Sequence, residues 1–180
     1  MTMQYKRLGD SGLEVSPLCL GTMMFGDRTD AVEARRIVDD ALAAGINFID
    51  TADVYANGKS EEIVGAAIGG NRRHWILATK VGDPLNKSPH YGGLSRRWVL
   101  TGCDDSLSRL KTDYIDIYYL HKDDRDTPIA ETVGTIGNLI SSGKIRYFGI
   151  SNYRGWRIAE VVSECEAQGV PLPASPTTTF

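Results

Sequence analysis

The stretch Tyr114-Ile115-Asp116-Ile117-Tyr118-Tyr119-Leu120-His121 decides the fold, because it is a short apolar run that ends on an ionisable residue. Short runs rich in β-branched and aromatic residues are typical of strands buried in a parallel sheet. Similar runs occur at residues 17–21, 46–50, 75–80 and 145–150. The sequence therefore predicts five parallel strands, whose ends lie near Gly21, Asp50, Lys80, His121 and Ser151.

Segments with apolar residues at helical spacing separate these runs. They cover residues 30–44, a segment opening at 60–65, and residues 95–110, 127–142 and 153–168. Ser60 is placed to cap the second of these helices. Residues 5–8 and 13–15 flank Gly9-Asp10-Ser11-Gly12 and predict a hairpin ahead of the first strand. The alternation predicts an α/β fold with helices covering a parallel sheet.

The spacing of the strand ends favours a barrel over an open doubly wound sheet. No GxGxxG motif follows the first strand, which weakens a dinucleotide-binding doubly wound fold. A β/α barrel of ~250 residues uses roughly 31 residues per unit, and the strand ends recur at about that interval. We expect a single domain over residues 1–180 of the (β/α)8 TIM-barrel type. It would be incomplete, with the hairpin and about five to six βα units.

Composition restricts the partners and the compartment. The chain has 180 residues and a formal net charge of -3, with no block of like charge, so neither nucleic acid nor a membrane is an expected partner. No apolar run approaches the ~20 residues of a membrane span. The opening residues lack the apolar stretch of a secretory signal, so a cytoplasmic protein is expected.

The cysteines and two of the histidines give no sign of a metal or disulfide site. Cys19, Cys103 and Cys165 are isolated from one another, and no ligand-like spacing occurs, so no metal is expected. Cys19 stands in an apolar run and is predicted to be buried. His74 and His90 lie in polar surroundings and are predicted to be surface residues.

Polar side chains at successive strand ends predict one shared site. In a β/α barrel these ends meet at one mouth, which would gather Asp50, Lys80, His121 and Ser151-Asn152. Each residue also has a structural alternative. Asp50 or Ser151-Asn152 could cap a turn or helix, and Lys80 could be a solvated strand end. His121 could be a core histidine, and Tyr55 an ordinary loop aromatic. These alternatives would have to hold independently at every strand end, so we favour the shared site.

These residue types suit proton transfer. A phenol ordinarily titrates near pH ~10, and an adjacent ammonium favours its ionised form. A carboxylate partner makes a mostly buried ammonium tolerable. Tyr55, Lys80 and Asp50 provide such a chain, while His121 can donate a hydrogen bond to a substrate oxygen. The groups of Ser151 and Asn152 suit a planar carboxamide.

The motifs around these residues resemble those of the aldo-keto reductase family, from about Tyr5 to Ala174. They are RLG (7–9), SGL (11–13), VS (15–16), LGTM (20–23), NFIDTADVY (47–55), GKSE (58–61), ATK (78–80), SLSRL (106–110), DYID (113–116), LH (120–121), GKIR (143–146) and GISN (149–152). The resemblance implies an enzyme that reduces aldehydes or ketones to alcohols with NADP(H), or alternatively NAD(H), and without a metal.

The resemblance also assigns roles. Tyr55 would be the general acid, Lys80 and Asp50 its tuning partners, and His121 the group that orients the carbonyl. Cofactor contacts would come from Gly21, Thr22, Met23, Asp50, Ser151 and Asn152, and a substrate wall from Met23, Met24 and Phe25. Lys122-Asp123-Asp124 departs from the family's usual run after the histidine, which leaves the substrate open. Two alternatives to an enzyme stay open. Proteins of this fold also serve as regulatory subunits of membrane channels, and the chain could be an inactive truncated remnant.

The pattern changes after Ala174. The family would continue into a strand reading roughly Gln-Pro-x-Tyr-Asn, whereas residues 175–180 read Ser-Pro-Thr-Thr-Thr-Phe. One choice of codons for these residues gives Gln-Pro-Tyr-Tyr-Asn-Leu in the neighbouring frame, so we expect an out-of-frame tail. A barrel lacking its later units would have open strand edges that promote self-association. It would also lack the usual phosphate site, so the chain as written should bind the cofactor weakly or undetectably.

Overall fold

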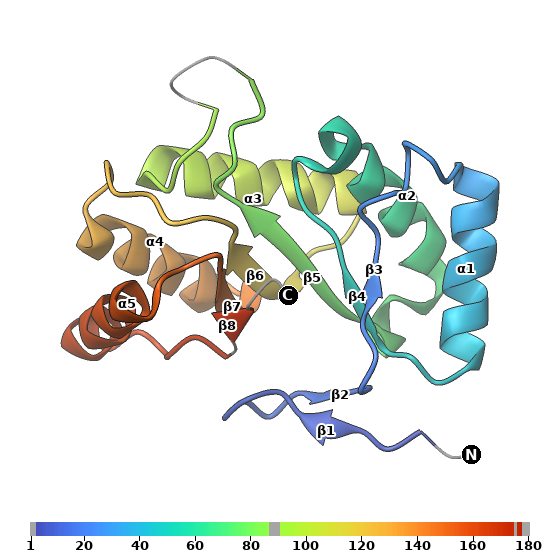
Figure 1. Ribbon diagram of the computed structural model, residues 1–180, viewed down its shortest axis with the longest axis horizontal. Coiled ribbons are helices and arrows are strands. Elements are labelled where there is room, and N and C mark those ends of the chain that lie inside the picture. Colours follow the sequence, from blue (N-terminus) through green and yellow to red (C-terminus); the bar gives the residue numbers. More distant parts are fainter. Residues whose placement is uncertain (1–2, 87–90, 175, 178–180) are drawn as a thin grey trace.

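Six parallel strands form the centre of the computed structural model, which describes residues 3–86, 91–174 and 176–177 (Figure 1). Within these residues they lie in the order β3-β4-β5-β6-β7-β8, so neighbours in the sequence are also neighbours in the sheet. The strands are β3 (Leu20–Gly21), β4 (Phe48–Asp50), β5 (Ile76–Val81), β6 (Ile115–Leu120), β7 (Ile145–Ser151) and β8 (Pro176–Thr177). This order is that of consecutive units in a β/α barrel.

Helices connect the strands and cover one face of the sheet. They are α1 (Ala31–Ala43), α2 (Lys59–Ile68), α3 (Arg96–Leu110), α4 (Ile129–Ser141) and α5 (Gly155–Gln168), with 3-10 helices η1 (Tyr55–Gly58) and η2 (Gly69–His74) on either side of α2. In Figure 1, α1 and α2 lie at one side of the strands and α4 and α5 at the other, with α3 between them. The helices thus wrap around a curved sheet.

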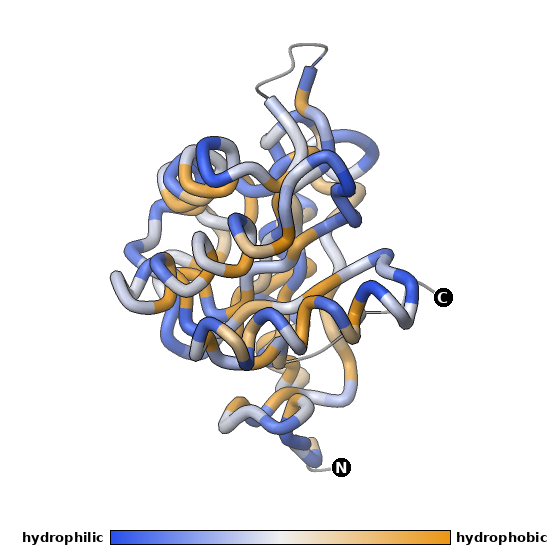
Figure 2. Tube along the Cα trace, turned by 90° about the vertical axis from the view of Figure 1, so that its left-hand side faces the viewer, coloured by the Kyte–Doolittle hydropathy of each residue, from blue (hydrophilic) through white to orange (hydrophobic). Residues whose placement is uncertain are grey.

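The main core lies between the helices and the sheet. Strand residues such as Ile49, Leu77 and Phe148 pack there against helix residues such as Val99 and Ile136, and all five are almost completely buried. Complete burial of such a side chain stabilises the fold by about 1.5–3 kcal/mol. In Figure 2 the hydrophobic colour follows the strands and the inner sides of the helices, as this packing requires.

A smaller cluster lies on the opposite face of the sheet. Ala78, Ile117 and Tyr119 are buried there, and Leu8 and Leu13 pack against them. Leu8 directly follows β1 (Lys6–Arg7) and Leu13 directly precedes β2 (Glu14–Val15). These two strands pair as an antiparallel hairpin. The hairpin therefore covers this face from the end where the strands begin, and Figure 1 shows it below the sheet.

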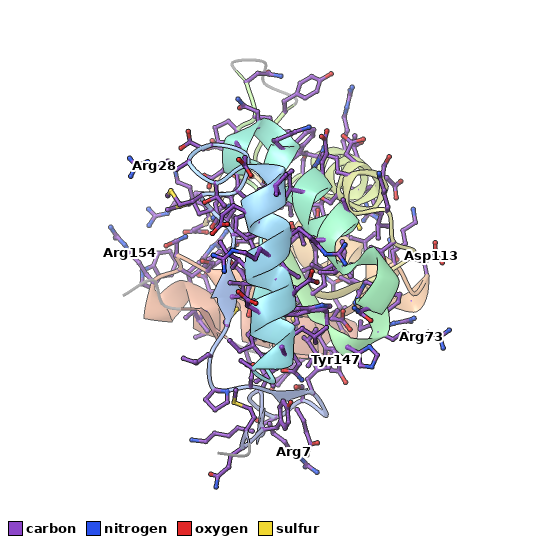
Figure 3. All side chains as sticks on the ribbon, turned by 90° about the vertical axis from the view of Figure 1, so that its right-hand side faces the viewer. Arg7, Arg28, Arg73, Asp113, Tyr147 and Arg154 are labelled. Atoms are coloured by element: carbon purple, nitrogen blue, oxygen red, sulfur yellow. The ribbon has the colours of Figure 1, made fainter. Side chains whose placement is uncertain are left out.

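The strands all end at the same edge of the sheet. Arg28 and Arg154 lie in the loops that follow β3 and β7, whereas Arg73 and Asp113 lie just before β5 and β6. In Figure 3 the first pair projects from one side of the molecule and the second pair from the other. Loops that follow strands are therefore gathered on one side, as in the mouth of a barrel.

Two local predictions are wrong. Ser60 is not an N-cap, because α2 begins at Lys59 and its N-cap is Gly58, with a left-handed φ of 85°. Ser60 instead lies buried in the first turn, where its hydroxyl donates to the backbone oxygen of Thr22 over 2.9 Å. Cys19 is exposed rather than buried, because it adjoins β3, an edge strand of the described sheet, so no next strand covers it there.

The other predictions about elements agree with the structure where residues are described. The hairpin and the five predicted strands form, each predicted helical segment contains a helix, and His74 is exposed. His90 lies outside the described residues, as does most of the expected tail at 175–180. At Pro176–Thr177 the backbone pairs in parallel with β7. No helix in the described part of the chain combines the length and apolarity needed to cross a bilayer.

Candidate active site

The predicted tetrad assembles around the ammonium of Lys80. Its Nζ atom donates hydrogen bonds to Asp50 Oδ2 at 2.5 Å, to the backbone oxygen of Thr51 at 2.7 Å and to the hydroxyl of Tyr55 at 3.2 Å. The rings of Tyr55 and His121 meet edge to face, with their centroids 6.0 Å apart. Residues from two strand ends and two loops therefore form one cluster, as the strand-end argument predicted.

Burial explains why the charges in this cluster are paired. Only 5% of Lys80 is exposed, so its charge is tolerable only with partners that replace water. Its three acceptors match the three protons of an ammonium. Burial raises the pKa of Asp50, while the attraction of Lys80 opposes that rise. The ion pair also holds Nζ 4.7 Å from the centre of the Tyr55 ring.

The backbone of His121 is fixed by both neighbouring strands. Its N–H donates to the backbone oxygen of Val81 at 2.8 Å, and its backbone oxygen accepts from the amide of Asn152 at 2.8 Å. Burial lowers the pKa of the imidazole, the positive charge of Lys80 lowers it further, and Asp83 acts in the opposite direction. The neutral ring is therefore favoured near pH 7.

The loop that carries Tyr55 has an unusual backbone. Ala56, Asn57 and Gly58 have φ values of 48°, 54° and 85°, so three successive residues are left-handed. This conformation suits glycine but costs of order 1 kcal/mol or more at each of the other two positions. The chain adopts it only because the surrounding structure holds the loop, which directly follows Tyr55.

A buried ion pair packs against the loop that carries Tyr55. Glu61, in the first turn of α2, is completely buried, and its carboxylate accepts from Thr79 Oγ1 at 2.5 Å and from Arg109 Nε at 2.7 Å. A side chain at Gly58 would collide with Arg109, because a Cβ there would lie 2.9 Å from Arg109 Cδ. Glu61 thus ties the loop region to β5, one residue before Lys80, and to α3.

Glu61 and Arg109 belong to the motifs GKSE (58–61) and SLSRL (106–110), which do not indicate that the two residues pair. They stand 48 positions apart, and no local pattern in the sequence signals their pairing. One feature of the sequence could have indicated that Glu61 has a cationic partner. It stands next to apolar residues in Glu61-Glu62-Ile63-Val64, and a carboxylate on a buried helix face needs such a partner.

The residues predicted to contact the cofactor and substrate fall into two groups. Met23 and Met24 are exposed beside the end of β3, and a Cβ at Gly21 would meet no atom within 4 Å. Thr22 and Phe25 are enclosed by protein. The hydroxyl of Thr22 bonds to the backbone oxygen of Asp50 at 2.9 Å, and Phe25 belongs to the main core. Their ligand contacts stay predictions.

The groups at this edge fit a nicotinamide. Gly21 leaves open space for a flat ring near Asp50, and the hydroxyl and amide of Ser151 and Asn152 stand at the end of β7. Asn152 has a φ of 59°, which turns the chain directly after the strand. Within the described residues, no three His, Cys, Asp or Glu side chains are grouped as metal ligands would be.

Comparison with known proteins identifies the family. The family model described as "Aldo/keto reductase family" matches residues 17–174. The chain belongs to the aldo/keto reductase family. A solved structure, the holo form of aldo-keto reductase AKR11C1 from Bacillus halodurans, superimposes with a TM-score of 0.88 at 40% identity, covering 99% of this chain and 58% of that one. The α/β fold with barrel-type βα units is thereby confirmed, as part of a barrel.

Two curated relatives of this aldo/keto reductase carry different descriptions. The uncharacterized oxidoreductase YrpG of Bacillus subtilis is 44% identical, with 91% of this chain and 54% of the relative covered. A probable voltage-gated potassium channel subunit beta of Arabidopsis thaliana is 43% identical, with 88% and 49% covered. The chain spans about half the length of the curated relatives it matches.

Proposed function

We propose that this chain forms the proton-transfer site of an NADP(H)-dependent oxidoreductase that reduces aldehydes or ketones to alcohols. The observation that carries the proposal is the position of Lys80, whose ammonium is hydrogen-bonded to both Asp50 and the hydroxyl of Tyr55. A phenol whose oxygen accepts a hydrogen bond from a buried, paired ammonium gives up its proton more readily and is suited to act as a general acid.

Each residue of the tetrad has one task in this reaction. When bound, the reduced nicotinamide supplies the hydride to the carbonyl carbon. Tyr55 gives its hydroxyl proton to the carbonyl oxygen, and Lys80 stabilises the resulting phenolate. Asp50 holds Lys80 in place. His121, whose ring edge meets Tyr55, engages the same oxygen and orients it.

The cofactor and substrate would lie beside the exposed residues at the mouth. Asn152 is exposed and its amide can bind a carboxamide, whereas Ser151 is 5% exposed and its hydroxyl accepts from the Asn152 amide at 3.1 Å. Gly21 leaves room for the ring. The exposed side chains of Met23 and Met24 offer an apolar surface to a substrate. This surface favours a carbonyl with an apolar substituent and agrees with the family's use of small carbonyl compounds.

A second candidate is a regulatory subunit, for which the 43% identity to a probable potassium channel subunit beta is the specific observation. The intact contacts among Tyr55, Lys80 and Asp50 favour the enzyme, because a purely structural subunit does not need a phenol on a buried ammonium.

Turnover separates the two candidates. The complete product of the gene is assayed for oxidation of NADPH with 4-nitrobenzaldehyde, a broadly accepted aldehyde. We expect reduction by the wild type and a loss of about 10²- to 10⁴-fold in kcat for Tyr55→Phe. Tyr91→Phe is the matched control, because Tyr91 is exposed and its ring packs at a tilt against that of Trp98. Binding of NADPH without turnover would support the regulatory subunit instead, and full activity of Tyr55→Phe would refute the assigned acid.

A further inference from the structure

Asp83 stands next to the imidazole of His121, outside the tetrad that the sequence identified. It lies two residues after β5, and its Oδ2 atom is 3.1 Å from His121 Nδ1. Nδ1 is itself completely buried, and no described residue makes a hydrogen bond of good geometry with it. The carboxylate is at hydrogen-bonding distance but off the direction of the N–H, a misalignment common in sites without their ligands.

The other groups that face His121 do not compete for Nδ1. Lys80 lies on β5 and is committed to Asp50, Thr51 and Tyr55. The Tyr55 ring meets the imidazole edge to face, and the amide of Asn152 is bonded to the backbone oxygen of His121. Lys80 repels a proton on the ring, and Asp83 is the group that attracts one.

We propose that Asp83 is a positioning residue that holds a proton on Nδ1 of His121 and thereby selects the tautomer and orientation of the ring. A neutral imidazole carries only one N–H. With that proton on Nδ1, the neutral ring has only an acceptor at Nε2, and Nε2 donates only when the ring is cationic. The neutral ring then accepts a hydrogen bond from a hydroxyl, and only the cationic ring donates one to a carbonyl oxygen, so His121 orients the carbonyl in its protonated form. The tautomer itself does not depend on turnover. The hydrogen bonds of Nε2 to a carbonyl substrate or an alcohol product rest on the proposed function.

Nitrogen NMR tests the inference without requiring activity. The chain has three histidines, so protein labelled with ¹⁵N-histidine gives a simple long-range proton–nitrogen spectrum. The variant His121→Gln assigns the signals of His121. At a pH where this ring is neutral, we expect the wild type to carry its proton on Nδ1. In Asp83→Ala we expect the proton to move mainly to Nε2, and the pKa of His121 to fall because the carboxylate that attracts the ring proton is lost.

Two further variants keep the test decisive. Asp126→Ala removes a carboxylate from an exposed position in the loop after β6 and should leave the tautomer unchanged. Asp83→Asn retains the size of the side chain and tests the loss of charge alone. An Nε2–H tautomer in the wild type, or an unchanged tautomer in a folded Asp83→Ala, overturns the inference. An Nδ1–H tautomer that depends on Asp83 in a protein without turnover supports the inference and counts only against the proposed function.

Discussion

The Nζ atom of Lys80 lies 3.2 Å from the hydroxyl of Tyr55, although 25 positions separate the two residues in the sequence. The contact exists because β4 and β5 are parallel neighbours, paired from Phe48↔Ile76 to Asp50↔Ala78. Parallel pairing places both strand ends at one edge, and Tyr55 lies in the loop after β4, directly before the left-handed residues Ala56, Asn57 and Gly58. The chemistry of the site thus follows from the direction of the strands and from one strained loop.

The buried pair of Glu61 and Arg109 should contribute strongly to stability. Replacing Arg109 with methionine leaves the carboxylate of Glu61 buried without its cation, which typically costs 3–5 kcal/mol. Because 21% of the Arg109 side chain is exposed, we expect a loss of about 3 kcal/mol in the free energy of unfolding, measured with urea. The double variant Glu61→Gln/Arg109→Met should be more stable than Arg109→Met.

An exposed ion pair serves as the control for that prediction. Arg35 and Asp39 pair on α1 with about half of each side chain exposed. Such pairs contribute about 0–1 kcal/mol, so Arg35→Met should change stability little. A similar loss in Arg35→Met and Arg109→Met would mean that burial of Glu61 does not set the cost.

Asp53 should make stability fall as pH rises. It is 1% exposed, and no hydrogen bond of good geometry reaches either carboxylate oxygen from the described residues. Burial, with repulsion from Glu61, raises its pKa from 3.8 to about 8, while Arg109 and the nearby Val54 N–H oppose the rise. Between these values the folded state holds a proton that the unfolded state has lost, so the free energy of unfolding decreases with pH.

The variant Asp53→Asn isolates this effect from other titrating groups. From pH 5 to pH 9 the wild type should lose roughly 2–4 kcal/mol more than the variant, since one pKa unit corresponds to ~1.4 kcal/mol. Urea unfolding of both proteins across this range measures the difference. Parallel stability curves for the two proteins would show that Asp53 titrates normally.

Gly65 should be required where α2 crosses α3. A Cβ at this position would lie 2.6 Å from the carbonyl carbon of Leu110, which is backbone and cannot move aside cheaply. We expect Gly65→Ala to cost about 1–3 kcal/mol, despite the better helix propensity of alanine. Gly69→Ala is the control, because a Cβ there meets nothing within 4 Å and should be neutral or slightly stabilising. Equal thermal stability of the two variants would contradict the close packing of the helices.

The strand-end residues could be predicted because their positions depend on a regular repeat. An apolar run predicts a buried strand, and a polar residue that follows the run lies at the carboxyl end of that strand. Asp50, Lys80 and His121 follow from this rule, and Tyr55 follows from a motif close behind Asp50. The position of each of these residues can therefore be predicted from a short local segment of the sequence.

Other features depend on contacts between distant or irregular segments. The pairing of Glu61 with Arg109 and the approach of Asp83 to His121 join positions that share no periodic pattern. The start of α2 at Lys59, with Gly58 as its N-cap, depends on a left-handed backbone at Gly58. The sequence does not show that conformation, and Ser60 is a more usual N-cap residue. The exposure of Cys19 depends on which strand lies beside β3. The apolar residues around Cys19 do not indicate which strand that is.

A double-variant cycle on Tyr55 and Lys80 tests the central claim, that the two residues act as one proton-transfer unit. It measures kcat/KM for NADPH-dependent reduction of 4-nitrobenzaldehyde by the complete gene product and its Tyr55→Phe, Lys80→Met and doubly substituted forms. Residues that act as a unit have strongly non-additive effects. We predict that each single variant loses about 10²- to 10⁴-fold and that the double variant is within tenfold of the slower single one. Losses that multiply in the double variant would contradict the account.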